Sequence, residues 1–166
     1  HYLIVKAMAS GSEHEQSTRW WAAPFALTIG LVFDLQTGLI SGIAFLVGGL
    51  WLSPDLDTNS IALRRWGILK GLWWPYRKMI KHRSILSHSP FIGTVLRVGY
   101  LLAALSLLLF LIQSSGFADT LKTKYLLDKL ITQNPKFFGA ILLGLEASTW
   151  LHLAKDGDPL PKKWHK

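Results

Sequence analysis

The chain of 166 residues carries 18 Lys and Arg against 10 Asp and Glu, and it is 50% hydrophobic but only 17% charged. This length suits one domain with a sizeable core, and the low charged fraction excludes a disordered or highly soluble chain. With no cysteine in the sequence, disulfides, thiolate metal sites and cysteine nucleophiles are excluded. A net charge of +8 suits nucleic acid or an anionic membrane surface, and the apolar bias favours the membrane.

Four apolar stretches follow one another, and no strand-length segment alternates convincingly between apolar and polar residues. Residues 20–33 and 39–52 are separated by a short turn, so we expect a helical hairpin in which Gly38 stops the first helix. Residues 91–113 are long enough to span a membrane, which takes about 20 apolar residues, and residues 137–154 are borderline. The sequence therefore predicts an all-α, membrane-associated bundle of about four apolar helices.

A basic and aromatic segment lies between the second and third stretches. Residues 61–81 contain six Lys or Arg and no acid, interleaved with three Trp and one Tyr. This pattern is typical of a helix lying in the membrane interface. The alternatives are a surface helix whose aromatic side chains pack inward, and nucleic-acid binding, which nothing else in the chain supports. A weaker amphipathic helix is predicted over residues 118–131.

The charge distribution gives the membrane topology that we expect. If all four stretches cross, the chain ends share one side with residues 53–90, which carry seven Lys and Arg against two Asp. The positive-inside rule makes that side cytoplasmic. All eight Trp fall on the same side, and such a belt also fits shallow insertion without full crossing.

Several polar side chains in this apolar chain are of types that bind metals. Asp55 and Asp57 follow the second stretch, where they can converge on a cation or act as turn and cap residues. His82 and His88 lie six residues apart, and neutral imidazole is the commonest metal ligand. His88 is the better candidate, because His82 stands among Lys and Arg as a surface residue would.

The last apolar stretch ends in a second candidate pair. His152 and Asp156 are four residues apart and share one helix face, which suits two ligands or equally a helix-end pair. His14 lies in a polar turn before the first stretch, where a lone His is unremarkable. The four-pass topology nevertheless brings all these residues to one membrane face. Glu146 either supports such a site or packs against a buried partner such as Arg97.

The blocks ASGSEHEQST, GGLWLSPDLD, WGILKGLWWPYRKMIKHRSILSHS and GLEASTWLHLAKD together resemble an uncharacterised family of bacterial, membrane-associated metal-binding proteins. The resemblance covers residues 9–158. More distantly, the order His, P-D-x-D, H-R-x-x-x-S-H and H-x-x-x-D is similar to the LexA-regulated inner-membrane metal-dependent hydrolases. The zinc-dependent phospholipase C group is a still weaker likeness. A small residue and an aromatic commonly follow the last His of the family, where this chain has Leu-Ala-Lys before Asp156.

The resemblance implies a divalent metal held by His and Asp, with zinc foremost and Mn, Fe or Mg tolerated by such ligands. The ligands exceed the four of a tetrahedral ion, so we expect either a cluster of two or three ions or one ion whose ligands are supported by the remaining side chains. Asp55 or Asp57 would bridge the metals or act as a base. Glu146 matches a Glu of the family's last block. The implied metal ligands are His14, Asp55, Asp57, His82, His88, His152 and Asp156.

The expected function is hydrolysis of a phosphoester or ester at the cytoplasmic face of a bacterial inner membrane, with membrane lipids as partners and no nucleic acid. The alternatives are a non-enzymatic, metal-stabilised membrane scaffold or assembly factor, and a soluble helical protein whose His and Asp are caps. Glycine-rich helix faces also allow a homo-oligomer. We expect a natural start at Met8, which makes His1–Ala7 upstream sequence and leaves residues 1–8 outside the fold. Residues 9–158 are expected to form one domain and residues 159–166 a basic tail. Alternatively, the chain is a fragment of a longer protein.

Overall fold

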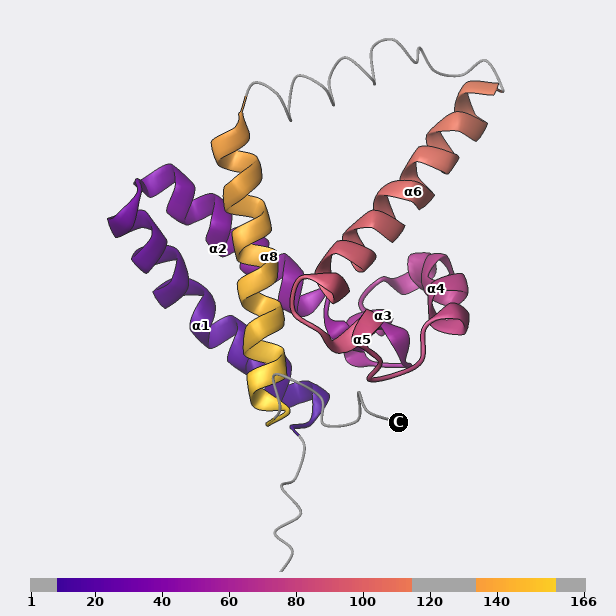
Figure 1. The fold of residues 1–166 in the computed structure, drawn as a ribbon, viewed down its shortest axis with the longest axis horizontal. Helices are drawn as coiled ribbons and strands as arrows, with labels where there is room; N and C mark the ends of the chain where they lie inside the picture. The colour runs from indigo at the N-terminus through magenta and orange to yellow at the C-terminus, as the bar shows by residue number, and fades with distance from the viewer. Residues whose placement is uncertain (1–8, 115–133, 158–166) are drawn as a thin grey trace, which may run out of the picture.

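The computed structural model describes residues 9–114 and 134–157, and all secondary structure in these residues is helical, which confirms the all-α class (Figure 1). In chain order the elements are α1 (Gly11–Val32), α2 (Leu35–Leu50), the 3-10 helix η1 (Pro54–Asp57), α3 (Ile61–Arg64), the 3-10 helix η2 (Gly67–Trp73), α4 (Trp74–Met79), α5 (Ile85–His88), α6 (Ile92–Ser114) and α8 (Pro135–Lys155). The amphipathic helix predicted over residues 118–131 lies outside the described residues.

Helix α1 begins well before the apolar stretch that predicted it. The Ser10 side chain accepts the N–H of Glu13, and the Glu13 carboxylate accepts the N–H of Ser10. This reciprocal pair satisfies two N–H groups that a helix start leaves free. His14 therefore lies inside α1, not in a turn before it.

The turn between α1 and α2 differs from the one expected. Asp34 caps α2 by accepting the N–H of Thr37 at 2.8 Å, and Gly38 lies inside α2, where it does not stop α1. A Cβ on Gly38 would lie 2.5 Å from the carbonyl oxygen of Ala26 and 2.6 Å from Cα of Gly30. The glycine is needed for close approach of the two helices, because any larger residue would push α1 away.

Helices α2 and α8 also meet backbone to backbone. A Cβ on Gly144 would lie 2.2 Å from the carbonyl oxygen of Ser41 and 2.8 Å from the N atom of Phe45. This contact sets the distance between the two helices. It thereby fixes where the C-terminal ends of α2 and α8 lie relative to each other.

Gly144→Val is expected to destabilise the protein by about 2 kcal/mol, because Cβ and its two methyl groups would be forced into a backbone contact. The melting temperature of the detergent-solubilised protein, followed by circular dichroism, measures the effect. Gly139→Val on the same helix is the matched control, since a Cβ there meets nothing within 4 Å. Equal melting temperatures for the two variants would contradict the prediction.

The basic segment over residues 61–81 is helical but broken into three short pieces, α3, η2 and α4. Gly67 has a left-handed φ of 55° at the first break. Trp73 and Tyr76 pack into the core, whereas the Trp74 side chain is exposed beside the Lys78 ammonium. A single interfacial helix is therefore not formed, and part of the aromatic set packs inward.

Three segments of the described residues are long and apolar enough to cross a membrane: Leu35–Asp57, Ile92–Ile112 and Pro135–Lys155. The first predicted stretch, within α1, is not among them. Helix α6 diverges from the rest of the bundle, and most of its length is exposed (Figure 1). The start of α1, the end of α8 and the short helices η1 and α5 gather at one end of the bundle.

Candidate metal centre

Two carboxylates are presented by the short helix η1. Pro54 opens this helix, and the Ser53 side chain accepts the N–H of Asp55 at 3.4 Å. A 3-10 helix has three residues per turn, so Asp55 and Asp57 stand within a single turn. The Asp57 side chain is completely buried, whereas that of Asp55 is 22% exposed.

Two histidines reach these carboxylates from the segment after α4. His82 Nδ1 lies 2.9 Å from Asp57 Oδ1. Arg83 then takes a left-handed φ of 58°, which turns the chain so that α5 carries His88 back toward η1. The buried His88 ring lies between the two carboxylates, with Nε2 at 3.5 Å from Asp55 Oδ1 and Nδ1 at 3.6 Å from Asp57 Oδ2.

The first and last described helices complete the cluster. His14 Nε2 of α1 lies 3.0 Å from Oδ1 of Asp156, which caps α8. The rings of His14 and His152 stack with centroids 3.8 Å apart. His152 Nε2 lies 3.6 Å from both Asp55 Oδ1 and Asp156 Oδ2. Residues from four separate parts of the chain thus meet at one place.

Three overlapping sets of side chains have ligand atoms within 4.8 Å of one another. Because they share Asp55, His88 and His152, the sets form one continuous cluster. Asp57 lies beside it, in contact with His82 and His88. The sequence-based ligand roles remain predictions, but all seven residues lie together. The three sets are His14, Asp55 and His152; Asp55, His82 and His88; and His88, His152 and Asp156.

The donor set fits a divalent cation. Nε2 of both His88 and His152 is buried without a hydrogen-bond partner, although each faces Asp55 Oδ1. The opposite ring nitrogens lie beside hydroxyl groups, His88 Nδ1 at 3.0 Å from Ser87 Oγ and His152 Nδ1 at 3.5 Å from Ser53 Oγ. Such contacts orient a metal-binding imidazole. A cation placed between the two Nε2 atoms and the Asp55 carboxylate would give all three groups a partner. Without a cation or a proton between them, buried lone pairs that face each other cost free energy.

The electrostatic surroundings of Asp156 keep it ionised. Burial by itself raises the pKa of this carboxyl, but the hydrogen bond with His14 and the charge of His152 bring the pKa below its ordinary value. An ionised carboxylate is the form that binds a cation. Arg83 also approaches it, with Nη2 at 3.7 Å from Asp156 Oδ2.

A polar cavity of about 310 Å³ opens over the cluster. Its wall is formed by the chain around Ser60, and the exposed side chains of Arg64 and Arg83 lie on its border. The cluster is therefore open to a small molecule on this side, and the arginines favour an anionic one. The candidate ligands that line the cavity are His14, Asp55, His82 and Asp156.

Sequence reasoning missed the role of Arg97. This side chain of α6 is only 1% exposed and donates to the Ser87 carbonyl oxygen at 2.8 Å and to Thr149 Oγ1 at 2.9 Å. It therefore ties α5, which carries His88, to α8. An arginine in an apolar stretch indicates a buried or functional role, but the sequence does not show which groups it binds.

Glu146 holds a turn outside the cluster. Its Oε1 accepts the N–H of Phe91 at 2.9 Å, and Phe91 has a left-handed φ of 58° just before α6 begins. A left-handed conformation is costly for a bulky residue and persists only where its surroundings hold it. Of the two alternatives for Glu146, this geometry favours the structural one, with a backbone group as the partner.

The fold and the cluster define a helical metal-binding protein with candidate membrane helices. The chain belongs to the family described as Uncharacterized metal-binding protein (DUF2227), whose model matches residues 9–166, and this confirms the resemblance seen in the sequence. An uncharacterized protein of Aquifex aeolicus (strain VF5) is 46% identical over 61 residues, which is 36% of this chain and 43% of that protein. The match thus spans less than half of the relative's length. No solved structure matches the chain.

Proposed function

We propose that the protein is a metal-dependent hydrolase of phosphoesters or esters at the cytoplasmic face of a bacterial inner membrane. The observation that carries this proposal is the polar cavity over the His/Asp cluster, which leaves the candidate ligands accessible on one side. A divalent ion held there supplies Lewis acidity and activates water. We propose zinc, because mixed imidazole and carboxylate ligands suit it.

The two aspartates of η1 have different surroundings and, we propose, different tasks. Asp55 is partly exposed and lines the cavity, so its carboxylate can accept a proton from a water molecule there. Asp57 is completely buried against His82 and His88, so it orients these imidazoles. The base is therefore assigned to Asp55 and the orienting role to Asp57.

The arginines on the border of the cavity favour a phosphoester over a neutral ester. A guanidinium group binds phosphate oxygens through paired, charge-assisted hydrogen bonds. Arg64 of α3 lines the cavity, and Arg83 lines it beside Asp156, with Nη2 at 3.7 Å from Asp156 Oδ2. Both would hold the anionic group of a substrate above the candidate ligands.

The same end of the bundle suits a membrane surface. The basic segment beside the cavity exposes Trp74 with the Lys78 ammonium 4.4 Å from the centre of its ring. Exposed cations and tryptophans of this kind bind anionic headgroups. Together with three candidate spans and the positive-inside rule, this supports a cytoplasmic site that acts on membrane lipids or other phosphoesters at the surface.

Hydrolysis by the detergent-purified protein tests the proposal. The protein is loaded with zinc, manganese, iron or magnesium and assayed against p-nitrophenyl phosphate, bis(p-nitrophenyl) phosphate and p-nitrophenyl acetate. We expect phosphoester hydrolysis that a chelator removes and the metal restores. A folded, metal-loaded protein without turnover of any substrate would refute the proposal.

Arg64→Gln is expected to raise the KM for the phosphoester about tenfold and to change kcat less than about twofold, because the lost contact binds substrate and transition state alike. Steady-state kinetics measure both constants. Lys70→Gln, which removes an exposed cation of η2 that does not line the cavity, is the matched control. An unchanged KM for Arg64→Gln would remove the argument for an anionic substrate.

A second candidate function is a metal-stabilised membrane scaffold or assembly factor. It is favoured by the way the cluster joins α1, η1, α5 and α8, with His14 stacked on His152. A structural ion is closed by protein ligands, whereas a catalytic ion keeps an open position. X-ray absorption spectroscopy of the zinc-loaded protein separates the two, since a water ligand indicates the hydrolase and a closed shell indicates the scaffold.

A further inference from the structure

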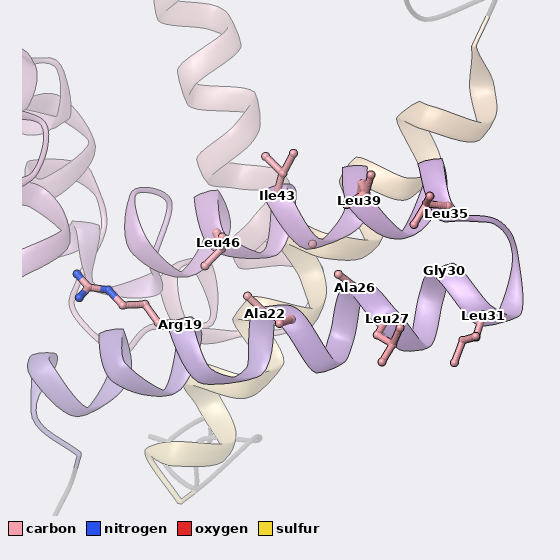
Figure 2. A pocket seen from close by; sticks show the side chains of 12 residues that line it. Arg19, Ala22, Ala26, Leu27, Gly30, Leu31, Leu35, Leu39, Ile43 and Leu46 are labelled. Carbon is pink, nitrogen blue, oxygen red and sulfur yellow. The ribbon is translucent and has the colours of Figure 1, made fainter.

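A long apolar groove runs along the seam between α1 and α2, separate from the metal centre. Its volume is about 820 Å³, and Figure 2 shows it on the hairpin with α8 passing behind. Arg19 is the one charged side chain among the described residues that line it. The groove thus combines an apolar floor with a single cation at one end.

Small residues create this groove. Ala22 and Ala26 of α1 lie against Gly42 of α2, and Gly30 lies against Gly38, so the floor is lined by little more than backbone and methyl groups. The walls carry larger side chains that are exposed, for example Leu31 at 79%. Because α2 belongs to a candidate membrane span, such an apolar surface would face lipid chains, and the groove offers one of them a defined place.

The groove has a headgroup end and an apolar end. The exposed Trp20 and Trp21 follow Arg19 directly in α1, and tryptophans gather at the level of lipid headgroups. The other end lies at the turn of the hairpin, and α2 belongs to a candidate membrane span. A rise of 1.5 Å per residue puts Leu31 about 18 Å from Arg19, which is close to the ~15 Å of hydrocarbon in one leaflet.

Arg19 is available to a ligand. Its guanidinium lies 3.6 Å from Glu15, and the side chain stays 62% exposed. Glu15 is already paired with Arg65 at 2.7 Å. The positive charge at the end of the groove is therefore only partly compensated by the protein.

We propose that this groove binds one acyl chain of an anionic phospholipid, whose phosphate is bound by Arg19. The apolar side chains of the groove would contact the acyl chain along its length, and the Arg19 guanidinium would donate a charge-assisted hydrogen bond to the phosphate. A second copy of this protein fits less well. Two parallel copies packed through the groove would place two Arg19 side chains at the same depth in the membrane, and like charges repel.

Native mass spectrometry tests the proposal on the full chain. The detergent-solubilised protein is incubated with equimolar phosphatidylglycerol and phosphatidylcholine vesicles, and the retained lipid is counted. Wild-type protein is expected to retain one phosphatidylglycerol molecule. Gly30→Leu should lower retention about tenfold, because its side chain fills the groove. A Cβ there lies 3.8 Å from Cα of Gly38, an ordinary contact, so the variant is expected to fold.

The matched control is Thr28→Leu, an exposed position of the same helix that does not line the groove. Ala23→Leu fills the groove from its exposed wall and serves if Gly30→Leu does not fold. Arg19→Gln should lower the preference for phosphatidylglycerol over phosphatidylcholine about fivefold, because one cation near an anionic membrane surface strengthens binding by about that factor.

Two results would overturn the proposal. One is lipid retention equal to that of wild type in both groove-filling variants. The other is a dimer that retains no lipid and that both variants dissociate, which would identify a second copy as the occupant. Metal content is expected to stay unchanged in every variant, because none of these positions belongs to the His/Asp cluster.

Discussion

His88→Ala and His152→Ala should each lower the metal affinity of the protein by at least about 100-fold, since even the residues that support metal ligands are worth 10- to 100-fold. Both side chains are buried, and each directs an unpartnered Nε2 toward Asp55. Elemental analysis of detergent-purified protein measures the effect. We expect one or more equivalents of a transition metal in wild type and almost none in either variant.

Loss of metal in both variants would show that α5 and α8 contribute to one site. His1→Ala is the matched control, because His1 precedes the segment that the family model matches. Circular dichroism of all proteins distinguishes loss of a ligand from loss of fold. Metal that persists in either variant would remove that histidine from the ligand set, and folded wild-type protein without metal would remove the centre itself.

Arg97→Met is expected to destabilise the protein by about 3 kcal/mol. The guanidinium satisfies the Ser87 carbonyl oxygen and Thr149 Oγ1 in a fully buried place. Methionine has a similar length but no donors, so the buried Ser87 carbonyl oxygen loses its partner at about 1–3 kcal/mol, and Thr149 Oγ1 loses a charged donor although it keeps its contacts with Thr94 and Leu145. Denaturant unfolding in detergent measures the change.

The same variant should weaken metal binding, because the Ser87 carbonyl oxygen precedes His88 by one residue. Arg97→Lys is expected to recover only part of the stability, since an ammonium group is a point donor and lacks the planar fork that reaches two acceptors. Leu105→Met, at an exposed position of α6, is the control. Stability of Arg97→Met equal to that control would contradict the structural role of Arg97.

Hydropathy predicted the apolar helices because burial in a bundle or a bilayer needs long apolar stretches. It predicted their ends less well. Helix α1 extends to Gly11 through polar residues because Ser10 and Glu13 cap it, and polar caps carry no hydropathy signal. The sequence predicts a helix end at Gly38, whereas this glycine allows close approach to Ala26, a contact that only the packed hairpin reveals.

The candidate ligands could be selected from the sequence because few side chain types bind metals and this chain has no cysteine. The four-pass topology predicted that these side chains converge, because it brings the ends of several helices to one side. The orientation of each side chain could not be predicted in this way. The turn at Arg83 and the hydroxyl groups beside His88 and His152 depend on backbone angles and packing between elements that are distant in the sequence.

The contact between His14 and Asp156 joins residues that are 142 positions apart. A ribosome must therefore produce every residue from His14 to Asp156 before these two side chains can meet, and a nascent chain that stops short of α8 lacks two of the candidate ligands. Closing so long a loop with a cation also restricts the unfolded chain, as a crosslink between distant residues does. A metal ion bound by these candidate ligands would thus require every segment from α1 to α8 to be in place, and it would hold α1 against α8.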